Sequence, residues 1–286
     1  MKRVKILSLI LVVVLSSLAF VGCTGSNSNE TPNNTQNNTQ NESTLKGSIN
    51  IIGSTSVQPL AQELADAFAS VETGVQIDIQ GVGSTAGVKA ANDGTADIGT
   101  ASRELKSEEK EWGLTEHVIA RDGIAIAVHP SNSVSDLTTE QAAKIFKGEI
   151  TNWKEVGGED KEIIVVSREA GSGTRGAFEE ILKIEDALVE TALIAEGNGA
   201  VKQNVATKQA AVGYVSLGYI DNSIKPVKVD GVEATVETIQ SNEYPVARPF
   251  LMLTKGELRP EVKAFIDFIM SSEGQKIVGE GYIPVK

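Results

Sequence analysis

The chain has 286 residues, with 26 Lys and Arg against 38 Asp and Glu, which gives a formal net charge of -12. This acidic balance argues against a nucleic-acid-binding protein, because such proteins neutralise phosphates with a basic face. One cysteine and two histidines are too few for a Cys/His zinc site or a disulfide framework, and 5% aromatic residues disfavour stacking platforms for bases or sugars. We therefore expect no metal ion, no cofactor and no nucleic-acid partner.

The first residues have the layout of a secretory signal. Lys2, Arg3 and Lys5 precede an apolar run over residues 6–21, and the small residue Gly22 follows it. The run is shorter than the ~20 apolar residues that a membrane-spanning helix needs, so a permanent span is the weaker interpretation. We predict that residues 1–22 are a signal peptide.

The one cysteine of the chain, Cys23, stands at the end of this run. The segment Phe20-Val21-Gly22-Cys23 resembles a bacterial lipobox, although Phe20 occupies the position where Leu is usual. The resemblance implies a lipoprotein in which Cys23 carries the lipid, palmitate included, that holds the protein on the extracytoplasmic face of the cell membrane. Residues 24–44 offer no apolar side chain to bury, so residues 23–46 are predicted to be the lipid-bearing cysteine and a disordered polar tether.

Beyond the tether, strands alternate with helices. An apolar strand over residues 48–52 leads through a hydroxyl-rich turn to an amphipathic helix with Leu60, Leu64, Phe68 and Val71 on one face. Further strands are predicted over residues 75–80, 96–102, 123–129 and 162–167. This alternation of β and α implies a largely parallel sheet.

Two more helices are predicted from side-chain periodicity. The charged residues between Lys106 and Glu111 are typical of a solvated helix face. Residues 260–278 carry apolar side chains at helical spacing and begin with Pro260, which predicts one continuous helix facing the core.

Three strands run into turns rich in glycine and hydroxyl groups, and each turn opens a helix. The turns are Gly53-Ser54-Thr55-Ser56, Gly81-Val82-Gly83-Ser84-Thr85-Ala86-Gly87 and Ala170-Gly171-Ser172-Gly173-Thr174. The first N–H groups of a helix lack intrahelical acceptors and carry partial positive charge, so such a turn can receive an anion. One turn of this kind is more often a simple N-cap. Three that converge at the carboxyl ends of parallel strands predict an anion site.

Arg168 ends the strand before the third turn. Its guanidinium could make a bidentate contact to a tetrahedral oxyanion, and charge-assisted hydrogen bonds of about 1.5–3 kcal/mol each would account for micromolar binding. The alternative for Arg168 is a surface ion pair with Glu169 or Glu162. Both interpretations stay open at this point.

The same segments carry a resemblance to a known family. The three turns, Ala96-Asp97-Ile98-Gly99 and residues 168–174 occur in the order and spacing of the PstS family, the phosphate-binding proteins of ABC importers. The resemblance covers nearly the whole body after the tether. It also includes residues 145–153, which look like a family signature without an obvious ligand role, and residues 244–249, where the chain returns to the first lobe.

The resemblance implies an α/β periplasmic-binding-protein fold of type II, with two parallel-sheet lobes joined by two crossovers and the ligand in the cleft. It places residues 47–124 and 248–286 in the first lobe and 125–247 in the second, with hinges near 123–126 and 248–251. Inorganic phosphate and the subunits of an ABC permease are the implied partners, and we expect a monomer that is not an enzyme. Carried over position by position, the phosphate ligands are Thr55, Ser56, Ser84, Ser102, Arg168, Ser172, Gly173 and Thr174.

Ser102 is a departure from the family pattern. High-selectivity members carry an Asp there, which accepts the proton of phosphate and repels fully deprotonated oxyanions. A serine hydroxyl accepts or donates, but it does not repel sulfate as a carboxylate does. Asp122 is a candidate replacement for the proton acceptor, and a turn carboxylate paired with Arg121 is the alternative. The hypothesis is that phosphate is preferred, but less exclusively than where the Asp is present.

Other functions are weighed against a phosphate receptor. Gly81-Val82-Gly83-Ser84-Thr85-Ala86 matches a dinucleotide fingerprint, but Ser102-Arg103 replaces the expected acidic residue at the next strand end. A secreted hydrolase of phosphate esters would need a positioned base, and only His117 and His129 could supply an imidazole. A receptor for another tetrahedral oxyanion, such as sulfate, is the alternative within the receptor class.

Overall fold

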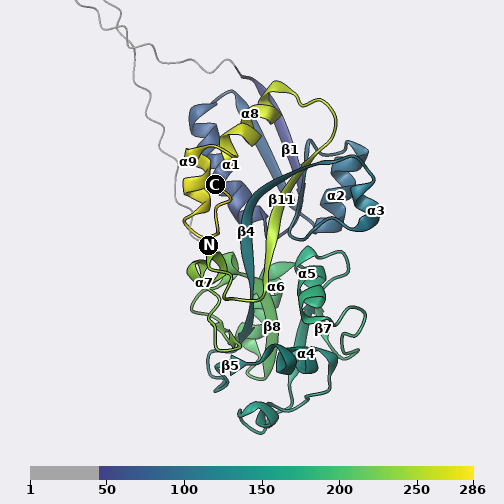
Figure 1. Ribbon diagram of the computed structural model, residues 1–286, viewed down its shortest axis with the longest axis vertical. Coiled ribbons are helices and arrows are strands. Elements are labelled where there is room, and N and C mark those ends of the chain that lie inside the picture. The colour runs from purple at the N-terminus through teal and green to yellow at the C-terminus, as the bar shows by residue number, and fades with distance from the viewer. Residues whose placement is uncertain (1–44) are drawn as a thin grey trace, which may run out of the picture. The chain divides into compact units, whose positions relative to one another are not determined.

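The computed structural model describes residues 45–286 (Figure 1). The predicted signal peptide, the lipidation site Cys23 and nearly all of the predicted tether lie outside the described residues. Within residues 45–286, no helix has both the length and the apolar character that a membrane crossing requires. The described residues form two α/β lobes, each with its own hydrophobic core.

The first lobe is built from the beginning and the end of the described chain. Its elements are β1 (Gly47–Gly53), α1 (Gln58–Val71), β2 (Val75–Gly81), α2 (Ser84–Asp93), β3 (Ile98–Ala101), α3 (Ser107–Lys110), β11 (Ala247–Thr254), α8 (Pro260–Ile269) and α9 (Ser272–Val278). Successive side chains of β11 point to opposite faces of the sheet, and different helices pack on the two faces. Phe250 and Met252 pack into the core beneath α1, α8 and α9, whereas Leu251 and Leu253 pack on the opposite face with α2.

The second lobe is built from the middle of the chain. Its elements are β5 (Asp136–Leu137), α4 (Thr139–Lys147), η1 (Trp153–Val156), β6 (Ile164–Arg168), α5 (Gly173–Leu182), β7 (Leu193–Ala195), α6 (Gly197–Thr207), β8 (Ala211–Ser216), η2 (Leu217–Tyr219), β9 (Lys225–Pro226), β10 (Lys228–Val229) and α7 (Val236–Gln240). The alternation recurs in β8, where Tyr214 packs with α4 and α5 and Val215 packs with α6. Each lobe is therefore a sheet with helices on both faces.

Strand β4 (Thr115–Val128) runs through both lobes beside β11 (Figure 1). Residues 115–123 of β4 pair antiparallel with β11, and Ile124–Val128 pair antiparallel with β8. The hydrogen-bonded order among the described strands is β2-β1-β3-β11-β4-β8-β6-β7, with β9 added on β4. The two lobes are thus connected by two neighbouring strands.

The sheet is mixed where a largely parallel one was predicted. The pairs β1·β2, β1·β3, β6·β7 and β6·β8 are parallel, as the β–α alternation requires, but β4 and β11 run against their neighbours. The fourth strand also begins at Thr115 and not at Gly123. Thr115, Glu116 and Val118 in its first half are exposed, so this half lacks the apolar run that marks the second half.

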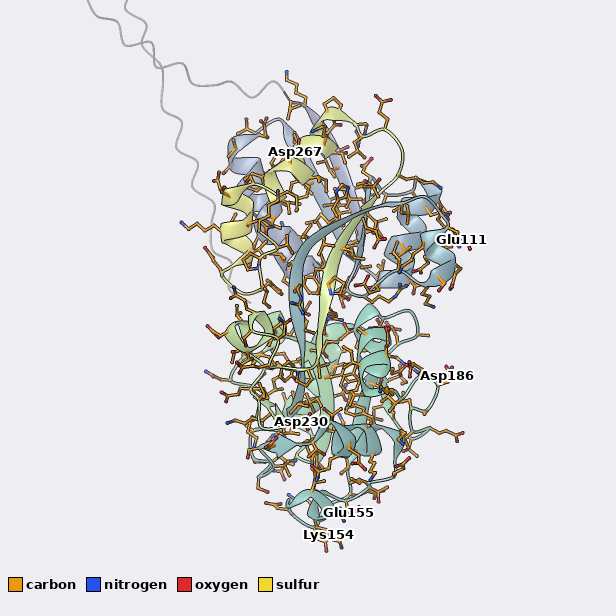
Figure 2. The ribbon with its side chains drawn as sticks, in the orientation of Figure 1. Glu111, Lys154, Glu155, Asp186, Asp230 and Asp267 are labelled. Atoms are coloured by element: carbon orange, nitrogen blue, oxygen red, sulfur yellow. The ribbon has the colours of Figure 1, made fainter. Side chains whose placement is uncertain are left out.

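Three predictions about helices were wrong in detail. Val71, assigned to the buried face of its helix, is 56% exposed because it is the last residue of α1. The single helix over residues 260–278 is two helices, and the second starts where Ser271 Oγ accepts a hydrogen bond from Gly274 N. Glu111, just after α3, points into solvent as expected (Figure 2), but Glu109 within α3 is buried and pairs with Arg103 at 2.7 Å.

Candidate anion-binding site

The predicted turns all stand where a strand ends and a helix begins. Ser56 lies between β1 and α1, Ser84 is the first residue of α2, and Gly173 and Thr174 open α5. Ser102 directly follows β3. The first two turns and Ser102 belong to the first lobe, and the third turn belongs to the second lobe, so an anion that contacts all of them lies between the lobes.

Arg168 connects the two lobes directly. Its guanidinium is 1% exposed, and it donates from Nη2 to Thr55 Oγ1 (3.1 Å) and from Nη1 to Thr174 Oγ1 (3.3 Å). It also pairs with Glu169 at 2.8 Å, so the ion pair exists beside the hydroxyl contacts. Burial alone would raise the pKa of Glu169, but the hydrogen bond and charge of Arg168 hold it below its ordinary value. The guanidinium is thus charged, buried and fixed in orientation.

The hydroxyl groups of the turns approach one another closely. Ser56 Oγ lies 2.8 Å from Thr174 Oγ1 across the lobes, and Ser84 Oγ accepts a hydrogen bond from Ser102 N (3.1 Å). At Gly173, a Cβ atom would lie only 2.2 Å from Ser84 Oγ, so this approach between lobes requires a glycine. These contacts bring together the predicted residues from all three turns.

Ser172 is a helix N-cap, the ordinary role of a serine in a turn of this kind. Its Oγ accepts a hydrogen bond from Arg175 N (3.2 Å) at the start of α5. Capping fixes the first turn of α5, and therefore the position of Thr174 opposite Arg168.

Two further residues belong to the site and were not predicted. Asn198 is fully buried and donates from Nδ2 to Ser56 Oγ (2.9 Å) and to Thr55 Oγ1 (3.2 Å). Arg248, 3% exposed, donates to Ser56 Oγ (3.1 Å) and to Ser102 Oγ (3.3 Å). A signal for Asn198 was present, because Gly197-Asn198-Gly199 follows β7 and opens α6 as a fourth turn of the same kind. For Arg248 the only signal was a cation within an otherwise apolar strand.

Asp122, the candidate proton acceptor, is hydrogen-bonded to groups of the protein. Its Oδ2 accepts from Arg248 Nη2 (2.9 Å) and Nε (3.2 Å), and its Oδ1 accepts from Ser216 Oγ (3.0 Å) and Leu217 N (3.3 Å). These four donors occupy the lone pairs of a carboxylate, so Asp122 would accept the proton of phosphate only by giving up one of them. The predicted alternative, a pair with Arg121, was wrong, because Arg121 donates to Asn242 Oδ1 instead.

The arrangement can bind an anion, and the two imidazoles lie elsewhere. His117 hydrogen-bonds Thr254 and His129 hydrogen-bonds Ser131, so neither imidazole is placed beside the hydroxyls of the turns. Across residues 45–286, no cluster of three or more His, Cys, Asp or Glu side chains is arranged to hold a metal ion. The cluster contains two buried guanidinium groups, those of Arg168 and Arg248, in contact with hydroxyl groups from two lobes, which is the chemistry of oxyanion recognition.

Backbone contacts also join the lobes around this site. Thr85 N donates to Gly171 O (3.1 Å), and Tyr219 Oη donates to Thr55 O (2.8 Å). Each of these bonds joins a donor and an acceptor from opposite lobes, so it holds the two lobes in contact near the turns.

Two α/β lobes with polar turns meeting around a buried cation define a solute-binding protein of the periplasmic type. Residues 38–273 match the PBP superfamily domain. The chain is 31% identical over 284 residues to the phosphate-binding protein PstS of Bacillus subtilis (strain 168), which covers 97% of this chain and 94% of the relative. It is 32% identical over 251 residues to PstS of Borreliella burgdorferi, covering 83% and 90% of the two chains. The chain belongs to the PstS family.

Solved structures agree with this assignment. A Clostridium perfringens substrate-binding protein, crystallised with bound phosphate, is 49% identical with a TM-score of 0.83, and the match covers 84% of this chain and all of that one. An ABC-type phosphate transport receptor from Vibrio cholerae is 39% identical with a TM-score of 0.71, covering 83% of this chain and all of that one. None of these four relatives is named as an enzyme.

Proposed function

We propose that this protein is an extracytoplasmic receptor that binds inorganic phosphate between its lobes and delivers it to an ABC import permease. The observation that carries the proposal is the position of Arg168, a buried guanidinium in contact with Thr55 of one lobe and Thr174 of the other. A ligand bridging the same groups would stabilise the closed arrangement of the lobes. A permease that recognises the closed form would then bind only receptors that carry a ligand.

The proposed phosphate ligands are the residues carried over from the family, with Arg168 as the charged donor. Thr55, Ser56, Ser84, Ser102 and Thr174 supply hydroxyl groups, Gly173 allows close approach of the turns, and Ser172 fixes the start of α5. We place residues 47–124 and 248–286 in the first lobe and residues 125–247 in the second, with β4 and β11 as the crossovers.

Titration calorimetry of the purified protein with sodium phosphate tests the binding. We expect a single site per chain and a micromolar or tighter Kd, and native mass spectrometry of protein purified without added phosphate should detect a retained anion. A protein that releases no heat with phosphate and carries no anion would contradict the proposal. Incubation with a chromogenic phosphate ester should give no turnover, because neither His117 nor His129 lies beside the turns.

We propose that Cys23 carries a lipid and anchors the receptor on the outer face of the cell membrane. The support is the signal-like layout of residues 1–22 and the lipobox-like residues that end at Cys23. A Cys23→Ser variant should move from the membrane fraction to the soluble fraction and lose labelling by palmitate. Equal membrane association of both proteins would rule out this anchor.

A further inference from the structure

Arg168 is the last residue of β6, and the pairing of β6 with β8 ends before it. That parallel pairing covers only Ile164 with Ala211 and Val165 with Val212. On its other side, β6 pairs with β7, a strand of three residues that ends the strand order of the described sheet. The end of the strand that carries the proposed charged ligand group therefore depends on further contacts to fix it.

The hydroxyl group of Tyr214 supplies one such contact. Tyr214 lies on β8 beyond Val212, the last position paired with β6, and its Oη accepts a hydrogen bond from Arg168 N (3.3 Å). The same oxygen lies 2.7 Å from Ser167 Oγ. Because a backbone N–H can only donate, the phenol oxygen acts here as the acceptor that a paired strand would otherwise provide.

The Tyr214 side chain is itself fixed by aromatic packing. Its residue is 1% exposed, and its ring stacks on Phe178 with a centroid distance of 4.0 Å and an interplanar angle of 14°. The ring of Phe146 lies 5.5 Å from Tyr214 and packs edge-on against Phe178 at 4.8 Å. Phe146 belongs to the family-like stretch 145–153, so this packing connects that stretch to the contact that holds Arg168.

Helix α5 adds a second contact to the backbone of Arg168. Arg175, on this helix, donates from Nη1 to Arg168 O (3.1 Å). Phe178, which stacks on the Tyr214 ring, lies on the same helix, and Thr174 is in its first turn. The contacts of Tyr214 therefore join the strand end that carries Arg168 to the helix that carries Thr174.

We propose that Tyr214 is a positioning residue whose hydroxyl group fixes the end of β6, so that the Arg168 guanidinium meets the ligand in one orientation. The inference rests on the proposed function and adds to it a residue that acts through Arg168. Side chains that bind a ligand keep their geometry only when neighbouring groups hold them in place. Burial raises the pKa of Tyr214 to about 12, so its hydroxyl is neutral at physiological pH, and removing it leaves the charge of the site unchanged.

A Tyr214→Phe variant tests the positioning role. It keeps the stacked ring and removes the acceptor of Arg168 N, so the end of β6 gains freedom. We expect phosphate to bind about three- to tenfold more weakly, the effect of losing one hydrogen bond. Calorimetric titrations of the full protein and of the variant with sodium phosphate give the two Kd values.

The matched control is Trp153→Phe in the same hydrophobic core. Trp153 is 1% exposed, and its Nε1 donates to Ala210 O (2.9 Å) at the start of β8, the end of that strand that lies away from the ligand turns. This variant loses a buried hydrogen bond and side-chain volume, so its Tm should fall at least as far as that of Tyr214→Phe. We expect its Kd for phosphate to equal that of the unaltered protein. Weaker binding in both variants, in proportion to Tm, would assign the effect to stability and overturn the inference.

Two further measurements locate the effect at Arg168. Amide hydrogen exchange followed by NMR should be faster at Arg168 N in Tyr214→Phe and not in Trp153→Phe, because only the first variant removes the acceptor. An Arg168→Lys protein lacks the guanidinium that Tyr214 is proposed to place. In that background we expect Tyr214→Phe to change the Kd for phosphate by less than about twofold, since the two substitutions act on one contact.

The outcomes separate this inference from the proposed function. Unchanged phosphate affinity in Tyr214→Phe, or the full loss of affinity in the Arg168→Lys background, would overturn the positioning role and leave the receptor function intact. If the unaltered protein binds no phosphate, the proposed function fails. Exchange at Arg168 N then still decides whether Tyr214 fixes this residue, because faster exchange in Tyr214→Phe supports the contact and unchanged exchange overturns it.

Discussion

Asp122 and Arg248 are directly opposite each other in the antiparallel pairing of β4 with β11, and their side chains form an ion pair of 2.9 Å. Both side chains are almost completely buried, at 0% and 1% exposed. The pair lies on the two strands that connect the lobes, and Arg248 reaches from it to Ser56 and Ser102. One buried ion pair therefore joins the crossover strands to the proposed ligand site.

Replacing Asp122 by Asn should destabilise the protein strongly. The change leaves Arg248 buried without its counter-charge, which typically costs about 3–5 kcal/mol. For a chain of this size, about 2–4 °C of Tm is lost per kcal/mol, so we expect Tm to fall by about 6–20 °C. Thermal unfolding followed by circular dichroism measures this directly.

The exposed ion pair of Lys263 with Asp267 is the matched control. Its side chains are 65% and 63% exposed, and such pairs contribute about 0.3–0.5 kcal/mol. Asp267→Asn should therefore change Tm by no more than about 2 °C. A double variant, Asp122→Asn with Arg248→Met, should recover part of the lost stability. If Tm falls equally in the single and the double variant, an unpaired buried charge is not the cause of the loss.

Replacing Arg168 by Lys should weaken phosphate binding by about 10- to 100-fold. Lysine keeps the charge, but it cannot contact Thr55, Thr174 and Glu169 at once, so at least one charge-assisted hydrogen bond of about 1.5–3 kcal/mol is lost. Calorimetric Kd values at fixed salt are the measurement. Arg259→Lys in the first lobe, where Arg259 pairs with Asp97, should bind phosphate normally.

Gly173→Ala should remove most of the phosphate affinity without unfolding either lobe. The added methyl group would lie 2.2 Å from Ser84 Oγ and 2.9 Å from Ser102 Oγ, across the boundary between lobes. We expect the clash to be relieved by separation of the lobes, which small-angle X-ray scattering would detect as a larger radius of gyration.

Gly199→Ala is the control for that substitution. A Cβ atom at Gly199 meets nothing within 4 Å, and the residue also lies near the start of a helix, in α6. Alanine there should leave binding unchanged and stabilise the protein by up to about 1 kcal/mol. Tight phosphate binding by Gly173→Ala would show that the turns can separate locally without opening the lobes.

Glu109 should make stability depend on pH in the acidic range. Burial alone would raise its pKa, but hydrogen bonds from Arg103 and the Lys106 backbone, with their charges, hold the pKa below the ordinary 4.5. A carboxyl group with a lowered pKa in the folded state adds stability above its unfolded pKa and loses it as pH falls through the folded value. The stability difference between the unaltered protein and Glu109→Gln should therefore be largest near pH 7 and shrink below about pH 4.5.

Urea unfolding at a series of pH values measures that difference. Because Glu140 is 77% exposed and pairs with Lys144 along its helix, Glu140→Gln serves as a control with a smaller effect. A constant difference between Glu109→Gln and the unaltered protein from pH 7 to pH 3 would contradict the role given to the Arg103 pair.

The parts of the site that were predictable are those encoded locally. Glycine and hydroxyl residues between a strand and a helix mark a turn, so Thr55, Ser84 and Thr174 could be identified from short segments. Asn198 belongs to a turn of the same type, but β7 before it has only three residues and gives little periodic signal. Arg248 is separated from Ser56 by 192 residues, and no local pattern relates two positions that meet only through the fold.

The errors in the fold have a similar origin. Parallel order follows from β–α alternation, but the antiparallel directions of β4 and β11 depend on the chain passing twice between lobes. The helix break at Ser271 was hidden because apolar residues continue on both sides of it. Glu109 was predicted to be a surface charge because the sequence does not show that Arg103 neutralises it in a buried position.

The pairing of β4 with β11 also constrains how the protein can move. Two separate linkers would let the lobes swivel and slide independently, whereas two strands bonded edge to edge behave as a single ribbon that flexes mainly across its flat face. The ladder shifts register between Phe250 and Leu251, which makes that place a natural point for such flexing. Opening and closing of the lobes should therefore be a rotation about one axis, and the guanidinium of Arg248 should move together with the two strands.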